Sequence, residues 1–163
     1  MVLGEWAGRR SIIGSYVSNR KTTCFLRFLF PIMMTKSAAF ITGATDGIGL
    51  HTARKLAASG DFQKLIVHGR DAQKLAKAKL EISRVAPPEL TVQTVQADLA
   101  DLSQVKDMCT ELLTERQSTD DRLSLLINNA GVYSPEHVTT LDGFELTYQG
   151  TALGPTDVRP RAF

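Results

Sequence analysis

Short strand-like runs alternate with amphipathic stretches along residues 36–129, and this alternation constrains the fold more than any other feature of the sequence. The runs have the length and apolar pattern of β-strands bounded by turn residues. We expect four strands, at Ser37–Thr42, Lys64–His68, Leu90–Gln96 and Leu123–Asn128. A strand–helix–strand order requires right-handed crossovers and a parallel sheet with helices on both faces. The sequence therefore predicts an α/β fold built on a doubly wound parallel sheet.

Three helices are expected between these strands, each with an apolar face and a defined end. The first spans Ile48–Ser59 and is closed by Gly60, in the position of a helix C-terminal cap. Asp71 and Ser103 are positioned to cap the second and third helices, and Pro87 ends the second. The apolar faces are formed by Ala53, Leu56 and Ala57, by Leu75, Ala78, Ile82 and Val85, and by Val105, Met108, Cys109 and Leu112.

A glycine-rich turn joins the first strand to the first helix, at the end of the sheet where open parallel sheets bind ligands. It reads Thr-Gly-Ala-Thr-Asp-Gly-Ile-Gly over residues 42–49. Gly43 permits a tight turn, Gly47 lets the backbone approach a diphosphate, and Gly49 lets the helix pack against the strand. The amides and dipole at such a helix start favour a phosphate group. Glycine also marks ordinary turns, so the strand and helix on either side carry the prediction of a nucleotide site.

Three motifs, in this order, resemble the signature of the short-chain dehydrogenase/reductase family. They are the glycine-rich turn, the pair Asp98-Leu99, and the run Asn128-Asn129-Ala130-Gly131. The resemblance covers about Lys36–Gln149, and the stretch Asp142–Gln149 is similar to the branch of retinol dehydrogenases and protochlorophyllide reductases. It implies a Rossmann-like domain over residues 35–149 that holds only the first four strands of the family's sheet. It also implies a nicotinamide dinucleotide as cofactor.

The resemblance implies cofactor-binding roles for residues at the ends of the strands. Asp98 is expected to accept a hydrogen bond from the adenine amino group, with Leu99 beside the ring. Asn128, Ala130 and Gly131 are expected to line the cleft and brace the fourth strand. Without the glycine-rich turn, Asp98 reads as a solvated loop acid and the asparagines as turn formers. The candidate cofactor-binding residues are Gly43, Thr45, Asp46, Gly47, Ile48, Gly49, Arg70, Asp98, Leu99, Asn128, Ala130 and Gly131.

Arg70 bears on the choice between NAD(H) and NADP(H). An NAD(H) enzyme places a carboxylate at the end of the second strand, about 20 residues after the glycines, to bind the ribose hydroxyls. This chain has Arg70 there, and its planar guanidinium can pair with the 2′-phosphate of NADP(H). Asp71 is able to serve the hydroxyls, but it is also placed to cap the next helix. The sequence therefore favours NADP(H) over NAD(H), with a structural Arg70 on a solvated loop as the alternative.

The catalytic pair that the resemblance calls for is missing from the sequence. The family's hydride transfer uses a Tyr-x-x-x-Lys pair, in which the lysine lowers the pKa of the tyrosine. None of Tyr16, Tyr133 and Tyr148 is followed four residues later by lysine, and the last lysine is Lys106. Thr151 occupies the place of an assisting asparagine in the related branch. We therefore assign no catalytic residue, and enzyme activity is left open.

Three functional interpretations follow. The first is an NADP(H)-dependent oxidoreductase acting on an unknown carbonyl or alcohol, with this chain retaining the cofactor-binding half and inactive alone. The second is a non-catalytic nucleotide-binding or interaction module, and the third is a non-functional truncated product. A fourth strand at the edge of a shortened sheet exposes unpaired backbone groups, so self-association through that edge is also expected.

Charge and composition divide the chain. Residues 1–34 hold five basic residues and one acid, a net charge of +4. The remaining residues therefore carry −2, which gives the whole chain its net charge of +2. This leader fits a mitochondrial or plastid transit peptide, with a spurious extension before Met33 and Met34, or a membrane-proximal anchor, as alternatives. The protein is accordingly cytoplasmic or organellar, and residues 150–163 read as a divergent tail.

The mildly acidic charge of the residues after the leader predicts no nucleic-acid partner. The three histidines and two cysteines are scattered, so they predict neither a metal site nor a disulfide.

Overall fold

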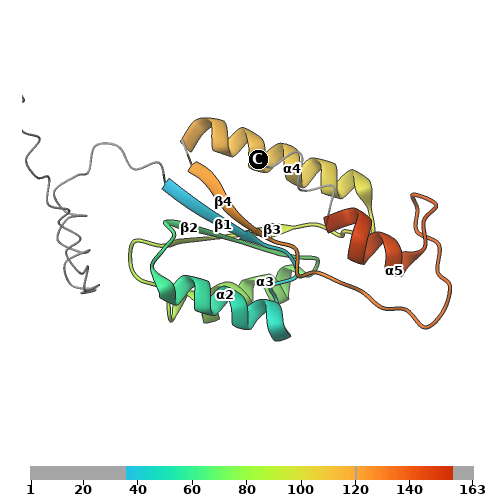
Figure 1. The fold of residues 1–163 in the computed structure, drawn as a ribbon, viewed down its shortest axis with the longest axis horizontal. Coiled ribbons are helices and arrows are strands. Elements are labelled where there is room, and N and C mark those ends of the chain that lie inside the picture. The colour runs from blue at the N-terminus through green and yellow to red at the C-terminus, as the bar shows by residue number, and fades with distance from the viewer. Residues whose placement is uncertain (1–35, 120, 156–163) are drawn as a thin grey trace, which may run out of the picture. The chain divides into compact units, whose positions relative to one another are not determined.

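The structure, a computed structural model, describes residues 36–119 and 121–155 (Figure 1). The predictions made for the leader at 1–34 and for residues 156–163 of the tail lie outside the described residues. Along the described part, no helix is both long and apolar enough to cross a membrane. The elements are β1 Lys36–Ile41, α2 Gly47–Ser59, β2 Lys64–Gly69, α3 Ala72–Ser83, β3 Thr91–Gln96, α4 Leu102–Thr119, β4 Asp121–Ile127, α5 Leu146–Tyr148 and the π-helix η1 Gln149–Leu153.

The four strands form one parallel sheet in the order β3-β2-β1-β4. A register shift interrupts the β1–β4 pairing between Ala38 and Ala39. Helices α2 and α3 cover one face of the sheet and α4 covers the other (Figure 1). This arrangement confirms the predicted α/β fold with a doubly wound, Rossmann-like sheet. It brings the carboxyl ends of all four strands to the same edge, where the candidate site residues lie.

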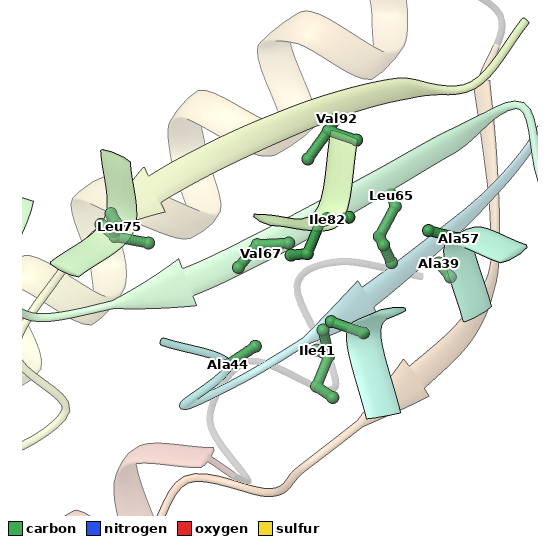
Figure 2. Packing of buried hydrophobic residues seen from close by; sticks show 10 residues of the cluster. Ala39, Ile41, Ala44, Ala57, Leu65, Val67, Leu75, Ile82 and Val92 are labelled. Atoms are coloured by element: carbon green, nitrogen blue, oxygen red, sulfur yellow. The ribbon is translucent and has the colours of Figure 1, made fainter. Parts of the chain in front are cut away.

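Alternate strand residues point to opposite faces of the sheet and bury two hydrophobic clusters. On the α2 and α3 face, side chains from three strands pack against both helices, as Figure 2 shows for Ile41, Leu65 and Val67. On the α4 face, Phe40 and Ile66 pack against the predicted apolar face of that helix. β2 is buried along its whole length, which explains its uninterrupted apolar run, because helices cover both of its faces.

The helix ends agree with the sequence at two positions and differ at two others. The Asp71 side chain accepts from the Lys74 amide at 2.9 Å and caps α3, and Gly60 closes α2 with a φ of 70°. The predicted capping role of Ser103 is wrong, because α4 begins at Leu102 and Ser103 already lies inside it. Val85 is not on the apolar face of α3, because the helix ends at Ser83 and Val85 is 37% exposed.

Asp101 provides the cap of α4 instead. Its carboxylate accepts hydrogen bonds from the Ser103 amide at 2.9 Å and the Gln104 amide at 3.3 Å. The hydroxyl of Ser103 and the side-chain amide of Gln104 donate to the same carboxylate. These bonds, those of the Ser103 hydroxyl foremost, lower the pKa of Asp101 to about 2. An ionised acid at this position also complements the positive end of the helix dipole.

The segment after β4 returns to the start of α4 through a polar network. The Asp142 carboxylate accepts from the backbone amide of Leu102 at 2.9 Å and from the side-chain amide of Gln149. Gln149 is fully buried, and its side-chain oxygen also accepts from the hydroxyl of Thr140. Every polar atom of this buried side chain thus has a partner, which is what its burial requires. The network holds α5 and η1 close to the cleft described next.

Candidate functional site

A cleft of about 700 Å³ opens at the carboxyl ends of the strands. Its lining comes from the turn after β1, the end of β2 with the start of α3, and the segments that follow β3 and β4, with Leu146 and Gly150 from the later elements. Eleven of the twelve candidate residues from the sequence line this cleft. The exception is Asn128, which is exposed and lies outside the lining.

The glycine-rich turn delivers unpaired amides to the cleft. Gly43 and Gly47 have φ angles of 63° and 53°, in the left-handed region that favours glycine. Asp46 caps α2 by accepting from the Gly47 amide at 2.8 Å, and Leu50 makes the first intrahelical bond, to the carbonyl of Asp46. The amides of Ile48 and Gly49 precede that bond and therefore have no acceptor within the helix. The start of α2 thus presents N–H groups and the positive end of its dipole to the cleft.

Gly49 is required for close packing. A Cβ placed on Gly49 would collide with the carbonyl oxygen of Gly43 and with the side-chain nitrogen of Asn129 at 2.5 Å. The sequence predicted contact between this helix and the strand. The closest neighbours are instead the turn and the segment after β4. A Cβ on Gly47 would meet nothing within 4 Å, so the backbone there faces open space from which a ligand can approach.

Thr42 and Asn129 join the ends of β1 and β4. The buried hydroxyl of Thr42 accepts from the amides of Asn129 and Ala130, each at 3.0 Å. The side-chain amide of Asn129 donates to the carbonyls of Thr42 at 3.0 Å and Gly43 at 2.9 Å. Sequence reasoning assigned no role to Asn129 beyond turn formation. The only sequence signal for Asn129 was its position in the run 128–131, and that run does not show which of its two asparagines points into the fold.

Two basic side chains line the cleft at the end of β2. Arg70 directly follows the strand, and its carbonyl accepts from the side chain of Gln96 at 3.1 Å. Lys74 lies one helical turn later on α3 and also lines the cleft. The intervening acid, Asp71, uses one carboxylate oxygen as the cap of α3. Sequence reasoning missed Lys74, although its place in the first turn of the helix that follows Arg70 would have indicated it.

Asp98 and Leu99 form the wall after β3. The Asp98 carboxylate accepts from the Ala100 amide at 3.0 Å, and its own amide donates to the side chain of Gln104 at 2.9 Å. Leu99 is buried. Asp98 therefore orders the loop in which it lies, and it also lines the cleft. Both interpretations of this acid from the sequence are compatible with that position.

His68 is a cleft residue that sequence reasoning passed over. It is buried near the end of β2, where its Nδ1 accepts from the amide of Gly43 at 3.2 Å. Its Nε2 lies 3.1 Å from the carbonyl oxygen of Ala97. Burial lowers the pKa of His68 below 6.5, against smaller opposing effects of the Ala97 carbonyl and the Asp98 charge. The ring is therefore neutral at pH 7, with Nε2 carrying the proton.

Thr151 holds the segment that leaves β4. Its hydroxyl accepts from the amide of Val132 at 3.0 Å and donates to the carbonyl of the same residue at 2.9 Å. Gly150 lies against Val132, because a Cβ there would come within 2.5 Å of a Val132 methyl. Thr151, predicted from the sequence to stand in the place of an assisting asparagine, thus ties the π-helix to the cleft wall. Among the residues that the structure describes, no group of three metal-ligating side chains is gathered.

Comparison with known proteins places these features in a wider context. Residues 37–149 match the family model for short chain dehydrogenases. Retinol dehydrogenase 13 of Homo sapiens is 32% identical over 152 residues, which cover 93% of this chain and 42% of that protein. The chloroplastic protochlorophyllide reductase of Chlamydomonas reinhardtii is 33% identical over 127 residues, covering 76% of this chain and 30% of the reductase.

Solved structures agree with these relatives. A short-chain dehydrogenase from Sphingobium yanoikuyae in complex with NADPH superposes with a TM-score of 0.61 at 25% identity. The match covers 78% of this chain and 46% of that one. A metagenomic short-chain oxidoreductase in complex with NADP gives a TM-score of 0.56, also at 25% identity, over 78% of this chain and 54% of the oxidoreductase. The chain covers only 28% to 42% of the full length of three curated relatives that it matches.

Proposed function

The chain belongs to the short chain dehydrogenase family, and we propose that its cleft binds NADP(H) as the cofactor-binding part of a carbonyl or alcohol oxidoreductase. The observation that carries the proposal is the free helix start of α2 at the carboxyl edge of a parallel sheet. The open space over Gly47 leaves room for a diphosphate, and the amides there favour its charge. When bound, the dinucleotide supplies or accepts the hydride.

The preference for NADP(H) over NAD(H) rests on charge at the end of β2. Arg70 and Lys74 both line the cleft there, and they suit a phosphate group on the ribose. Asp71, the carboxylate able to bind ribose hydroxyls instead, already caps α3. The two cations Arg70 and Lys74, beside an acid that already caps α3, support a site for the 2′-phosphate.

Replacing Arg70 with serine is expected to weaken NADPH binding by about tenfold or more, because a charge-assisted contact to the 2′-phosphate is lost. Binding of NADH, which lacks that phosphate, should change little. Isothermal titration of both cofactors gives the comparison. Arg54→Ser is the matched control, because Arg54 is exposed on α2 outside the cleft lining and the change in net charge is identical. Equal losses for NADPH and NADH would contradict the assignment of Arg70.

We infer that the 163-residue chain binds the cofactor without turning over substrate. This inference is supported by the sequence, in which no tyrosine is followed four residues later by lysine. The test is an NADPH titration followed by an assay of NADPH oxidation with a panel of aldehydes and ketones. Binding without oxidation is the expected outcome. Steady turnover by the chain would refute the inference, whereas failure to bind NADPH would refute the proposed function itself.

Self-association through β4 is the second proposal. Among the described strands, β4 pairs only with β1, and its apolar residues Leu123, Leu125 and Leu126 are only partly buried. An apolar edge with unpaired backbone groups favours pairing with another chain. The other edge strand, β3, carries polar residues between Val92 and Val95 and is less suited to this.

Hydrogen exchange of the chain at low and high protein concentration is expected to show β4 amides becoming more protected as the concentration rises. The amides of β3 provide an internal control, because they lie at the opposite edge of the same sheet. Sedimentation velocity at the same concentrations should show a parallel increase in mass. A monomer at every concentration, or equal protection at both edges, would count against pairing through β4.

A further inference from the structure

The ring of His68 connects three segments that meet at the cleft. His68 is the next-to-last residue of β2, Gly43 belongs to the turn after β1, and Ala97 directly follows β3. One ring nitrogen accepts from the Gly43 amide and the other is bonded to the Ala97 carbonyl. Within the described residues, no other side chain hydrogen-bonds across all three of these segments. His68 is therefore placed to fix the position of the first glycine of the turn.

Only the neutral ring can make both contacts. The Ala97 carbonyl is an acceptor, so Nε2 carries the proton, and Nδ1 must be unprotonated to accept from Gly43. A proton on Nδ1 would set two N–H donors against each other. The ring is buried, and the ring of Phe40 packs nearly perpendicular to it with centroids 6.4 Å apart. Water is therefore poorly placed to relieve such a conflict, and the Gly43 amide would have to move.

We propose that His68 is a positioning residue for dinucleotide binding, and that its neutral ring holds the glycine-rich turn in the form that receives the diphosphate. The proposal rests on the proposed function, because it concerns the same cleft. Its consequence is a loss of cofactor affinity when His68 becomes protonated. The Gly43 amide is then displaced, and the turn leading to the helix start moves with it.

The charges around His68 determine where this loss occurs. Charged residues that share its cleft come from the turn, from the end of β2 with the start of α3, and from the segment after β3. They are Asp46, Arg70, Asp71, Lys74 and Asp98. The lining from the segment after β4, from α5 and from η1 is uncharged, and α4 packs on this side of the sheet with apolar side chains. Burial outweighs the Ala97 hydrogen bond and the attraction of Asp98, so the pKa of His68 lies below 6.5, and the loss of affinity belongs to the acidic range.

The experiment compares the wild-type chain with His68→Asn and His68→Leu. An asparagine places its side-chain oxygen near the position of Nδ1 and keeps an acceptor for Gly43 without titrating. Leucine removes the acceptor. Dissociation constants for NADPH and NADH are measured from about pH 8 to about pH 5. NADH is included because it lacks the 2′-phosphate, whose own protonation at about pH 6 would alter the binding of NADPH.

Three results are expected. At about pH 8, His68→Leu binds about tenfold more weakly than the wild type, as for a lost hydrogen bond to a buried amide, and His68→Asn recovers most of that loss. As His68 becomes protonated below pH 6.5, the wild type loses affinity for NADH relative to His68→Asn, reaching about tenfold once the ring is fully protonated. Folding is checked at each pH by far-ultraviolet circular dichroism, and constants are compared only where the chains remain folded.

Two other outcomes would overturn the proposal. Parallel pH profiles for the wild type and His68→Asn would show that the state of His68 does not matter. A wild type that gains affinity at low pH relative to His68→Asn would show that the diphosphate prefers a charged ring. Failure of all three chains to bind either cofactor at about pH 8 would instead refute the proposed function, so the two failures are distinguishable.

Discussion

Thr42→Val is expected to lower the free energy of unfolding by about 2–4 kcal/mol, because two backbone amides lose their shared acceptor. Valine matches threonine in shape but has no oxygen. The amides of Asn129 and Ala130, which now donate to the hydroxyl at 3.0 Å, would be left without a partner. Thr42 is fully buried, so water cannot replace the hydroxyl without local opening. Cofactor affinity should also fall, because the displaced segment forms one wall of the cleft.

Urea unfolding followed by circular dichroism measures the change in stability, and an NADPH titration measures the change in affinity. Thr42→Ser is the matched control, because serine keeps the hydroxyl and removes only a methyl group. It should retain most of the stability and most of the affinity. A Thr42→Val chain as stable as Thr42→Ser would show that the hydroxyl does not support the junction between β1 and β4.

Gly49→Ala is expected to destabilise the fold by about 2–3 kcal/mol, the range for an added methyl group that the surroundings cannot accommodate. In an ordinary helix the same change stabilises by about 0.5–1 kcal/mol, because alanine loses less backbone entropy than glycine. The two effects therefore have opposite signs at this position. The methyl group would meet a backbone carbonyl, that of Gly43, and the Asn129 side chain that holds two strand ends together.

Thermal and urea unfolding determine whether Gly49→Ala lowers or raises the stability of the fold. An NADPH titration should show at least a tenfold loss of affinity, since the helix start would shift away from the turn. Gly47→Ala is the comparison variant. Its added methyl group meets nothing within 4 Å, and the expected loss of about 1 kcal/mol comes only from a φ of 53°. A Gly49→Ala chain that is as stable as the wild type would refute the packing argument.

Local sequence patterns were sufficient to predict the fold, because each pattern depends on one element and its covering layer. β2 is apolar throughout because both of its faces are covered, and α4 has an apolar stripe because only one of its faces is buried. The glycines of the turn were identified because positive φ angles and close approach leave few other choices. Helix ends were less predictable. Asp101 and Ser103 are both good caps, and only the start of α4 decides between them.

The remaining site residues depend on contacts between distant parts of the chain. His68 lies in an apolar run that reads as a strand, and its function depends on Gly43 and Ala97, which pairing brings beside it. The choice between Asn128 and Asn129 depends on which face of the chain turns inward after β4. No local pattern records these relations, because strand pairing and register create them. Lys74 alone had a local signal, its place in the first turn of the helix that Asp71 caps.

The hydrogen bonds of Thr42 to Asn129 and Ala130 join residues 87 and 88 positions apart in the chain. Contacts at such separation form slowly, because a long loop must close before they contribute. The cleft therefore cannot be complete while only β1, β2 and β3 have associated, because the segment after β4 forms one of its walls. During synthesis, β4 is the last of the four strands to emerge. If the cleft binds a nucleotide as proposed, retention on an immobilised nucleotide would distinguish chains in which β4 has docked from those in which it has not.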